Sequence, residues 1–316
     1  RSRRATPLRE VFVPMRSSAV PPLARSGFDR AEHRRTTIGS APDDAALVLP
    51  VHRDSAPVTA EAGSGTALHW WPSTDPALAE ADGEYGFLGA GPDGTDRWVL
   101  ALREVPASLD DGVSWAPLRV IGGELGDADG GAFVAAVSLG RWLLDSAHCP
   151  RCGSLSALQS GGWSRRCSFC EQDLFPRTDP AVIVAVTDPA GTRLLLGSHV
   201  AWGMGRFSCF AGFVEAGESL EATVTREILE EAGVHIEDMT YVASQAWPYP
   251  RSLMVGFSAV TSTEIPVADG EEIVEVRWFD RAEIGAALAG ESDVQLPGPS
   301  SIARALIEQW YRSAQQ

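Results

Sequence analysis

The sequence predicts a protein of the α+β class that is built from more than one domain. Apolar runs of strand length, such as Ala45–Val51 and Ala181–Val186, recur along the chain among segments with helical periodicity, such as Ala132–Asp145. Two Cys-x-x-Cys pairs near the middle of the chain separate these segments into two halves. At 316 residues, the chain is long enough for two or three domains.

The composition is that of an ordinary soluble protein, with 44% hydrophobic and 22% charged residues and no apolar run long enough to span a bilayer. Arginine supplies all 26 basic residues against 42 acidic ones, which gives a formal net charge of −16. A charge of this sign argues against broad adhesion to nucleic acid or anionic membranes. The odd cysteine count, with four of five in Cys-x-x-Cys pairs, does not suggest a disulfide framework, so we expect a reducing, cytoplasmic location.

The first half of the chain shows no catalytic constellation. Residues 1–37 are rich in Arg, Pro and Ser with little periodicity, and we expect a flexible tail there, with a transit peptide as the alternative. Residues 38–145 are expected to form a small α+β domain. Its expected elements are strands at Ala45–Val51 and Arg97–Leu102, a turn at Gly91–Asp96 and a helix over Ala132–Asp145.

Four cysteines in the middle of the chain predict a structural zinc site. Cys149 and Cys152 form one pair, and Cys167 and Cys170 form the second after fourteen intervening residues. Four thiolates in two such pairs match tetrahedral Zn²⁺ and leave no open position for catalysis, with a redox role as the alternative. We therefore expect a zinc ribbon over residues 146–174. Cys209 is left over and is expected to be a small core residue.

The second half, residues 175–316, is expected to form the catalytic domain. Its expected elements are strands at Ala181–Val186, Arg193–Gly197, Tyr241–Ser244, Leu253–Val260 and Glu275–Phe279, and an amphipathic helix at Ile302–Tyr311. Strands with helices packed on them predict a layered sandwich.

One stretch of this half, Gly212–Val234, combines a loop with an acidic helix. Ser219 is a plausible N-cap and Gly233 a plausible C-terminal stop. Glu227, Glu230 and Glu231 fall on one arc of the helix, and such a cluster would repel itself unless a hard cation such as Mg²⁺ or Mn²⁺ bound it. A solvated acidic face is the alternative. On the other side of the helix, we expect three residues to be buried, namely Ala222, Thr225 and Leu229.

This stretch resembles the Nudix box, G-x5-E-x7-R-E-U-x-E-E-x-G-U with U aliphatic, and every fixed position is filled. The resemblance implies an α/β/α sandwich and hydrolysis of a diphosphate linked to another group. It also implies that Glu227 and Glu231 are metal ligands, that Glu230 assists, and that Glu231 orients or deprotonates the attacking water. Arg226 is expected to hold loop carboxylates such as Glu218.

A second motif narrows the substrate. The segment Ser244–Met254 reads SQAWPYPRSLM and resembles SQPWPFPxS, which marks the NADH pyrophosphatase subfamily of Nudix hydrolases. Trp247 and Tyr249 carry rings suited to stacking, and Gln245 and Ser252 can hydrogen-bond to a nucleotide. The remaining expected substrate-binding positions of the motif are Ala246, Pro248, Pro250 and Arg251. Ala246 departs from the motif's proline, and Tyr249 from its phenylalanine.

The subfamily resemblance also implies sites outside the two motifs. Glu272, with Glu271 as the adjacent alternative, matches a further metal-binding glutamate. Phe213, Phe175 and Ala303 match residues that contact the substrate, and Phe175 stands where the family has tyrosine. The resemblance further implies a homodimer and an N-terminal domain related to the Nudix fold but lacking its box.

These motifs predict hydrolysis of NADH or NAD⁺ to nicotinamide mononucleotide and AMP, with removal of NAD caps from RNA as a related activity. Two alternatives remain open. One is a Nudix hydrolase of ADP-ribose or another nucleoside diphosphate derivative, and the other is a non-catalytic zinc-ribbon regulator that binds nucleotides or RNA.

Overall fold

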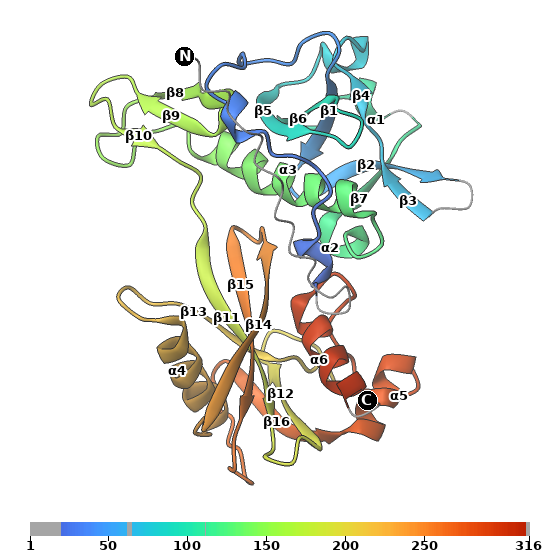
Figure 1. The fold of residues 1–316 in the computed structure, drawn as a ribbon, viewed down its shortest axis with the longest axis vertical. Coiled ribbons are helices and arrows are strands. Elements are labelled where there is room, and N and C mark those ends of the chain that lie inside the picture. Colours follow the sequence, from blue (N-terminus) through green and yellow to red (C-terminus); the bar gives the residue numbers. More distant parts are fainter. Residues whose placement is uncertain (1–19, 62–64, 111, 314–316) are drawn as a thin grey trace, which may run out of the picture.

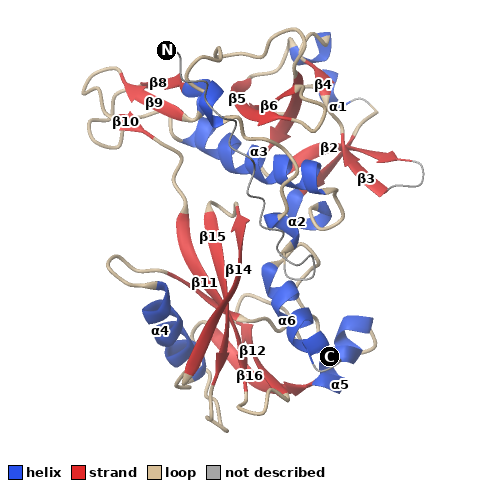
Figure 2. Cartoon of the chain, viewed as in Figure 1, coloured by secondary structure: helices blue, strands red, loops and turns tan. Residues whose placement is uncertain are grey.

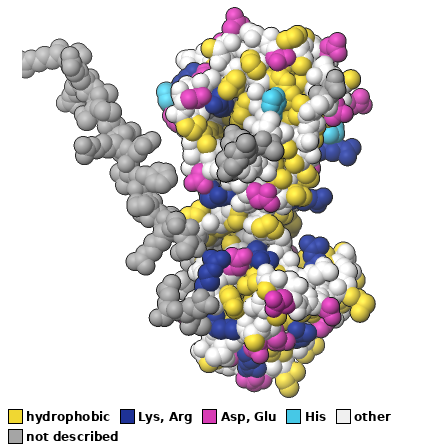
Figure 3. All heavy atoms as spheres, turned by 90° about the vertical axis from the view of Figure 1, so that its right-hand side faces the viewer, with side chains coloured by type: hydrophobic (Ala, Val, Ile, Leu, Met, Phe, Trp, Pro, Cys, Tyr) yellow, Lys and Arg dark blue, Asp and Glu magenta, His cyan; other side chains and the backbone are white. Residues whose placement is uncertain are grey.

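The computed structural model describes residues 20–61, 65–110 and 112–313. Within these residues the chain forms an N-terminal lobe, a small three-stranded ribbon and a catalytic lobe (Figure 1). The two lobes meet at a narrow waist, and acidic and basic side chains are mixed on the face shown in Figure 3. None of the described helices combines the length and apolar character that crossing a bilayer requires.

The N-terminal lobe is a mixed sheet with one long helix on it. The sheet runs in the order β3-β2-β1-β6-β5, with β4 beside β1 and β7 beside β2. Its strands are β1 (Leu47–His52), β2 (Ser55–Glu61), β3 (Gly65–Leu68), β4 (Trp71–Pro72), β5 (Gly83–Ala90), β6 (Asp96–Leu102) and β7 (Ser114–Pro117). Its helices are α1 (Ala107–Asp110), α2 (Leu118–Ile121) and α3 (Asp127–Asp145), with 3₁₀ turns at Pro22–Ala24, Glu32–Arg34 and Pro76–Leu78.

The helix α3 begins five residues before the expected helix. Gly130 and Gly131 lie in its first turns, where glycine is intrinsically unfavourable, so the sequence pattern alone did not include them. A Cβ on Gly131 would lie 3.1 Å from the backbone of both Arg25 and Ser26. Glycine therefore lets the segment before β1 cross the helix closely at this point.

That crossing segment corrects part of the expected tail. Residues 1–19 lie outside the described residues, but residues 20–37 pack against the folded chain. Leu23 is buried in the core of the N-terminal lobe, and Asp29 pairs with Ala90 at the end of β5. The expectation of a flexible tail was wrong for this part, because apolar residues such as Leu23 and Phe28 join the core without forming a regular element.

The ribbon joins the lobes and comprises β8 (Ser156–Gln159), β9 (Ser164–Cys167) and β10 (Asp173–Leu174), with a 3₁₀ turn at Ser160–Gly162. The central strand β9 pairs antiparallel with both β8 and β10. The ribbon buries few apolar side chains of its own, and its four cysteines lie in one cluster.

The catalytic lobe is a sandwich with helices on both faces of a sheet (Figure 2). The sheet runs in the order β14-β15-β11-β12-β16, with β13 beside β11. Its strands are β11 (Asp179–Thr187), β12 (Arg193–His199), β13 (Phe210–Phe213), β14 (Asp238–Trp247), β15 (Ser252–Val260) and β16 (Ile273–Asp280), and its helices are α4 (Leu220–Ala232), α5 (Arg281–Ala289) and α6 (Ile302–Arg312).

Alternation along the central strand β11 explains the two helical layers. Val182 and Val184 point into the core beneath α4, whereas Ile183 and Ala185 point into the core beneath α6. Both faces of this strand are buried, which accounts for its continuous apolar run. The α/β/α sandwich expected from the sequence is confirmed.

Candidate active site

The acidic helix α4 is fixed at both ends as the sequence predicts. Ser219 Oγ accepts a hydrogen bond from the Ala222 N–H at 3.2 Å, and Gly233 adopts a left-handed conformation with φ 65° at the C-terminus. The expected buried face was wrong, however. Ala222, Thr225 and Leu229 are exposed, whereas the residues packed toward the sheet are Thr223, Val224, Ile228, Glu231 and Ala232.

Because this face of α4 packs toward the sheet, two glutamates of the helix lie in a cleft at the end of β13. The cleft has a volume of about 480 Å³. Glu227 and Glu231 enter it from α4, and Glu272 enters from the loop before β16. The other lining residues are Ala181, Ala211, Gly212, Phe213, Glu215, Arg226, Trp247, Tyr249, Ser252 and Met254.

Glu231 is the most perturbed carboxylate of the cleft. Its side chain is only 4% exposed, and its Oε2 has no hydrogen-bond partner among the described residues. Burial raises the pKa of Glu231 to about 8, and the charges of Glu227 and Glu272 add to the effect. A buried carboxylate oxygen without a partner is the group that a bound cation or a water would satisfy.

Glu227 lies against the first glycine of the box. A Cβ on Gly212 would lie 1.9 Å from the Glu227 carboxyl, so any larger residue there would displace this side chain. Burial raises the pKa of Glu227, and Arg226, whose Nη1 is 2.9 Å from Glu227 Oε1, opposes that shift. The glycine therefore keeps the carboxylate inside the cleft.

Arg226 ties the box loop to the helix, as expected. It donates to both oxygens of Glu218, at 2.7 and 2.9 Å, and to the carbonyl of Phe213 at 3.1 Å. The bonds from Arg226 to Glu218, followed by the bond from the Glu215 N–H, lower the pKa of Glu218 to about 2. Arg226 also donates to Glu230 at 3.0 Å, and Glu230 is exposed and absent from the cleft lining. The structure thus brings Glu227 and Glu231 together but turns Glu230 outward.

The loop before β16 settles which of two adjacent glutamates faces the cleft. Glu272 lines it, whereas Glu271 does not. Asp269 Oδ1 accepts hydrogen bonds from the backbone N–H groups of Glu271 and Glu272 at 2.9 and 3.1 Å, which fixes the loop. His199 Nε2 lies 3.5 Å from Glu272 Oε1. Asp269 and His199 are site residues that the motifs did not reveal, because Asp269 lies in a loop without a recognisable pattern and His199 ends strand β12, outside both motifs.

The donor set fits a hard divalent cation. Carboxylate oxygens are the preferred ligands of such ions, and Glu231 offers an unsatisfied buried oxygen beside Glu227 and Glu272. These carboxylates are spread more widely than the four cysteines. Within the described part of the chain, the cysteines form the only group of three or more candidate ligands whose atoms all lie within 4.8 Å of one another.

The four-cysteine cluster fits a zinc ion. Three Sγ–Sγ distances are 3.7, 3.4 and 3.5 Å, for Cys149–Cys170, Cys152–Cys167 and Cys152–Cys170. Tetrahedral Zn²⁺ with Zn–S bonds of about 2.3 Å separates its sulfurs by about 3.8 Å. Cys209 lies apart in the catalytic core, and burial raises the pKa of its thiol to about 12, in line with a packing role.

An aromatic wall lines the same cleft as the carboxylates. Trp247 and Tyr249 line the cleft with their ring centroids 4.8 Å apart, and Phe213 lines it with 54% of its surface exposed. Ser252 also faces the cleft. These are the predicted substrate-binding residues that the structure brings together.

The other predicted substrate-binding residues lie elsewhere. Ala303 lines a second pocket of about 540 Å³, which shares Ala211, Trp247 and Met254 with the cleft. Phe175, Pro250 and Arg251 line a third pocket. Pro248 is buried, and Ala246 packs against the N-terminal core.

Gln245 is buried away from a substrate, which corrects its expected role as a hydrogen-bond partner of the nucleotide. It is 1% exposed and uses both ends of its amide inside the protein. Its Oε1 accepts from the Leu23 N–H at 3.2 Å, and its Nε2 donates to the Ser300 carbonyl at 3.0 Å. The residue joins the two lobes instead.

Tyr249 also joins the lobes through the hydroxyl that distinguishes it from the motif's phenylalanine. Its oxygen accepts a hydrogen bond from the Arg119 N–H at 3.0 Å. Burial, and then the charge of Asp54, raises the pKa of Tyr249 to about 12. Arg119 and Asp54 belong to the N-terminal lobe, and sequence patterns could not identify them because one partner is a backbone group.

The sandwich and its glutamate-lined cleft define a Nudix fold, and comparisons with known proteins agree. The Nudix domain family matches residues 177–296. The NAD-capped RNA hydrolase NudC of Mycobacterium tuberculosis strain H37Rv is 37% identical over 306 residues, covering 92% of this chain and 95% of that protein. The human NAD-capped RNA hydrolase NUDT12 is 35% identical over 261 residues, covering 72% of this chain and 56% of that protein.

Among solved structures, a Nudix hydrolase from Nitrosomonas europaea overlaps with a TM-score of 0.42 and 22% identity, over 53% of this chain and 92% of that chain. The chain belongs to the NADH pyrophosphatase subfamily of the Nudix hydrolases, as its two motifs predict.

Proposed function

We propose that this protein hydrolyses the diphosphate bond of NADH or NAD⁺, giving nicotinamide mononucleotide and AMP. We propose that the same cut removes the cap of NAD-capped RNA, releasing nicotinamide mononucleotide and leaving a 5′-monophosphate RNA. The names of its relatives in M. tuberculosis and human support this proposal. The single observation that carries it is Glu231, a buried carboxylate with a raised pKa that shares one cleft with an aromatic wall.

The cleft suggests a division of labour among its residues. Mg²⁺ or Mn²⁺ held by Glu227, Glu231 and Glu272 would supply positive charge to the diphosphate oxygens and acidify a water molecule. Glu231 would accept the proton of the attacking water. Arg226 and Gly212 hold the carboxylates in place. Trp247 and Tyr249 would hold a base or nicotinamide ring and so select a dinucleotide.

We further propose a structural Zn²⁺ at the four cysteines, a cytoplasmic location and a homodimer. The clustered free thiols support the first two proposals. Exposed Phe213 and Phe175 support the third, because apolar rings with 54% and 67% exposure are suited to cover by a second copy. We also propose the domain boundaries at about residues 145 and 174. The N-terminal domain then includes residues 20–37, because these residues pack against its core.

The test is hydrolysis of NADH, NAD⁺, ADP-ribose and NAD-capped RNA with Mg²⁺ or Mn²⁺, with products identified by mass spectrometry. Activity should vanish with EDTA, and Glu231→Gln should lower kcat by a factor on the order of 10²–10⁴. The matched control is Glu221→Gln, which removes an exposed acid from the first turn of the same helix and should keep full activity. Equal activity in both variants, or cleavage of ADP-ribose alone, would refute the proposal.

A further inference from the structure

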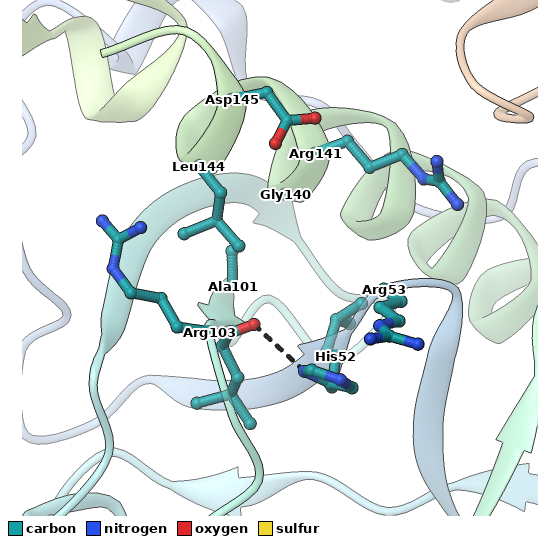
Figure 4. A pocket seen from close by; sticks show the side chains of 10 residues that line it. His52, Arg53, Ala101, Arg103, Gly140, Arg141, Leu144 and Asp145 are labelled. Atoms are coloured by element: carbon teal, nitrogen blue, oxygen red, sulfur yellow. Dashed lines mark hydrogen bonds between the residues drawn. The ribbon is translucent and has the colours of Figure 1, made fainter.

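One pocket of the N-terminal lobe concentrates positive charge in an otherwise acidic protein. It has a volume of about 460 Å³ and lies between the C-terminal half of α3 and the ends of β1 and β6 (Figure 4). Arg53, Arg103 and Arg141 line it, and Asp145 is the one carboxylate of its lining. The rest of the chain is strongly acidic, with a formal net charge of −16 for the whole.

The guanidinium groups of Arg53 and Arg103 are available to a ligand. Arg53 is exposed and forms no ion pair with a described carboxylate. Arg103 lies 3.6 Å from Asp82 and 3.9 Å from Glu84, long and solvent-exposed pairs that hold it weakly. Arg53 and Arg141 stand on one side of the pocket and Arg103 on the other (Figure 4), so a ligand between them would meet charge from both sides.

The pocket continues toward the catalytic cleft. A neighbouring pocket of about 600 Å³ shares Arg141 and Asp145 with it and adds Arg177 and Arg251. The guanidinium carbon of Arg141 lies 5.7 Å from the ring centroid of Tyr249, which is a wall of the cleft. We call these two adjoining pockets the arginine groove. The groove thus lies beside Tyr249 of the cleft and leads onto the N-terminal lobe.

The chemistry of the groove suits phosphodiesters. Arginine presents a planar fork of donors that matches phosphate oxygens, and it carries its charge at any physiological pH. Asp145, Asp173 and the ion pairs of Arg177 and Arg251 with Asp179 reduce the positive charge, so the groove would hold a chain only through several contacts.

We propose that the arginine groove binds the phosphodiester backbone of an RNA strand whose 5′ cap occupies the catalytic cleft. The inference rests on the proposed removal of NAD from RNA. A capped RNA has a chain that must leave the cleft, whereas a free dinucleotide ends within it. The groove therefore distinguishes the two substrates without contacting the diphosphate.

The experiment compares the wild type with Arg53→Gly, Arg103→Ala and the double variant on free NAD⁺ and on NAD-capped RNA. Arg53 has φ 57°, a conformation that glycine adopts without strain, so this change removes the charge and leaves the turn intact. The double variant should raise KM for capped RNA by about tenfold and leave free NAD⁺ kinetics unchanged. Arg103→Lys keeps the positive charge and should raise KM for capped RNA much less than Arg103→Ala does. Arg312→Ala on α6 is the matched control away from the groove.

Binding of 5′-monophosphate RNA of the same sequence, followed by fluorescence anisotropy, separates this inference from the proposed function. The slope of log affinity against log salt should fall by about 0.7 for each lost phosphate contact. Unchanged RNA binding in the double variant overturns the inference, even if the wild type cleaves NAD⁺ as proposed. A variant that weakens binding of inorganic phosphate but not of RNA would also overturn it, because the pocket would then hold a small anion.

Discussion

Glu231 shows how one residue acquires its chemistry from its surroundings. In sequence it is one of three similar glutamates in the second half of α4, yet folding buries it beside Ile228 and Ala232. Two other carboxylates, Glu227 and Glu272, face the same cleft and raise its pKa further. Glu230, one position earlier on the helix, stays exposed with Arg226. The side of the helix on which each glutamate lies therefore decides whether its carboxylate is buried with a raised pKa or solvated.

This environment predicts a pH-dependent stability in the protein stripped of divalent cations. The folded pKa of about 8 lies above the usual 4.5, so at intermediate pH the folded state holds a proton that the unfolded state has released. The contribution is fully present below the unfolded pKa and is lost as pH rises toward about 8, by at most about 1.4 kcal/mol per pH unit. We expect urea unfolding in EDTA to show this fall.

The control for this prediction is Glu231→Gln, which has no proton to release. Its free energy of unfolding should change less between about pH 5 and pH 8 than that of the wild type, because all other titrating groups are shared by the two proteins. Parallel curves for the two proteins would show that burial does not raise this pKa.

At the scale of elements, local rules predicted much of the catalytic lobe. The ends of α4 followed from Ser219 and Gly233, because capping depends on neighbouring atoms in the same segment. The buried side of α4 did not follow, because periodicity fixes which residues share a face but not which face meets the sheet. Leu229 is 41% exposed for this reason, although it is apolar. Gln245 was misassigned because its partners, Leu23 N–H and the Ser300 carbonyl, are distant in sequence.

The ribbon β8–β10 is the element expected to depend most on a metal, since it has a small core of its own. Cys152→Ser should reduce bound zinc from about one ion per chain and lower the melting temperature. Zinc content by mass spectrometry and thermal unfolding by circular dichroism measure the two effects. Cys209→Ala, which removes the thiol outside the cluster, should retain the zinc. Full zinc content in Cys152→Ser would contradict the four-cysteine site.

At the scale of the whole molecule, three hydrogen bonds across the waist each join a backbone N–H of one lobe to a side-chain oxygen of the other. Backbone N–H groups of Leu23, Arg119 and Gly123 in the N-terminal lobe donate to side chains of Gln245, Tyr249 and Ser300 in the catalytic lobe. Two of the acceptors belong to the motif segment that also forms the aromatic wall. The position of the aromatic wall in the cleft therefore depends on how the lobes pack together. Motif analysis cannot reveal this dependence, because the partners lie far apart in the sequence.

Tyr249→Phe tests this dependence because it removes the hydroxyl and keeps the ring. The Arg119 N–H would lose its partner, at a cost of about 0.5–1.5 kcal/mol, and the catalytic lobe would be held less firmly. We expect faster hydrogen exchange at the Arg119 amide and a KM for NADH raised severalfold, with a smaller change in kcat since Glu227 and Glu231 are untouched.

Tyr241→Phe is the matched control, because this exposed ring lies on β14, the strand that leads into the motif, and away from the waist. It should leave both the exchange rate and KM unchanged. Faster exchange in Tyr249→Phe without a change in KM would mean that the hydroxyl holds the lobes together but does not position the wall. Unchanged exchange would mean that the bond from Arg119 does not hold the waist, and that the ring alone anchors Tyr249 between the lobes.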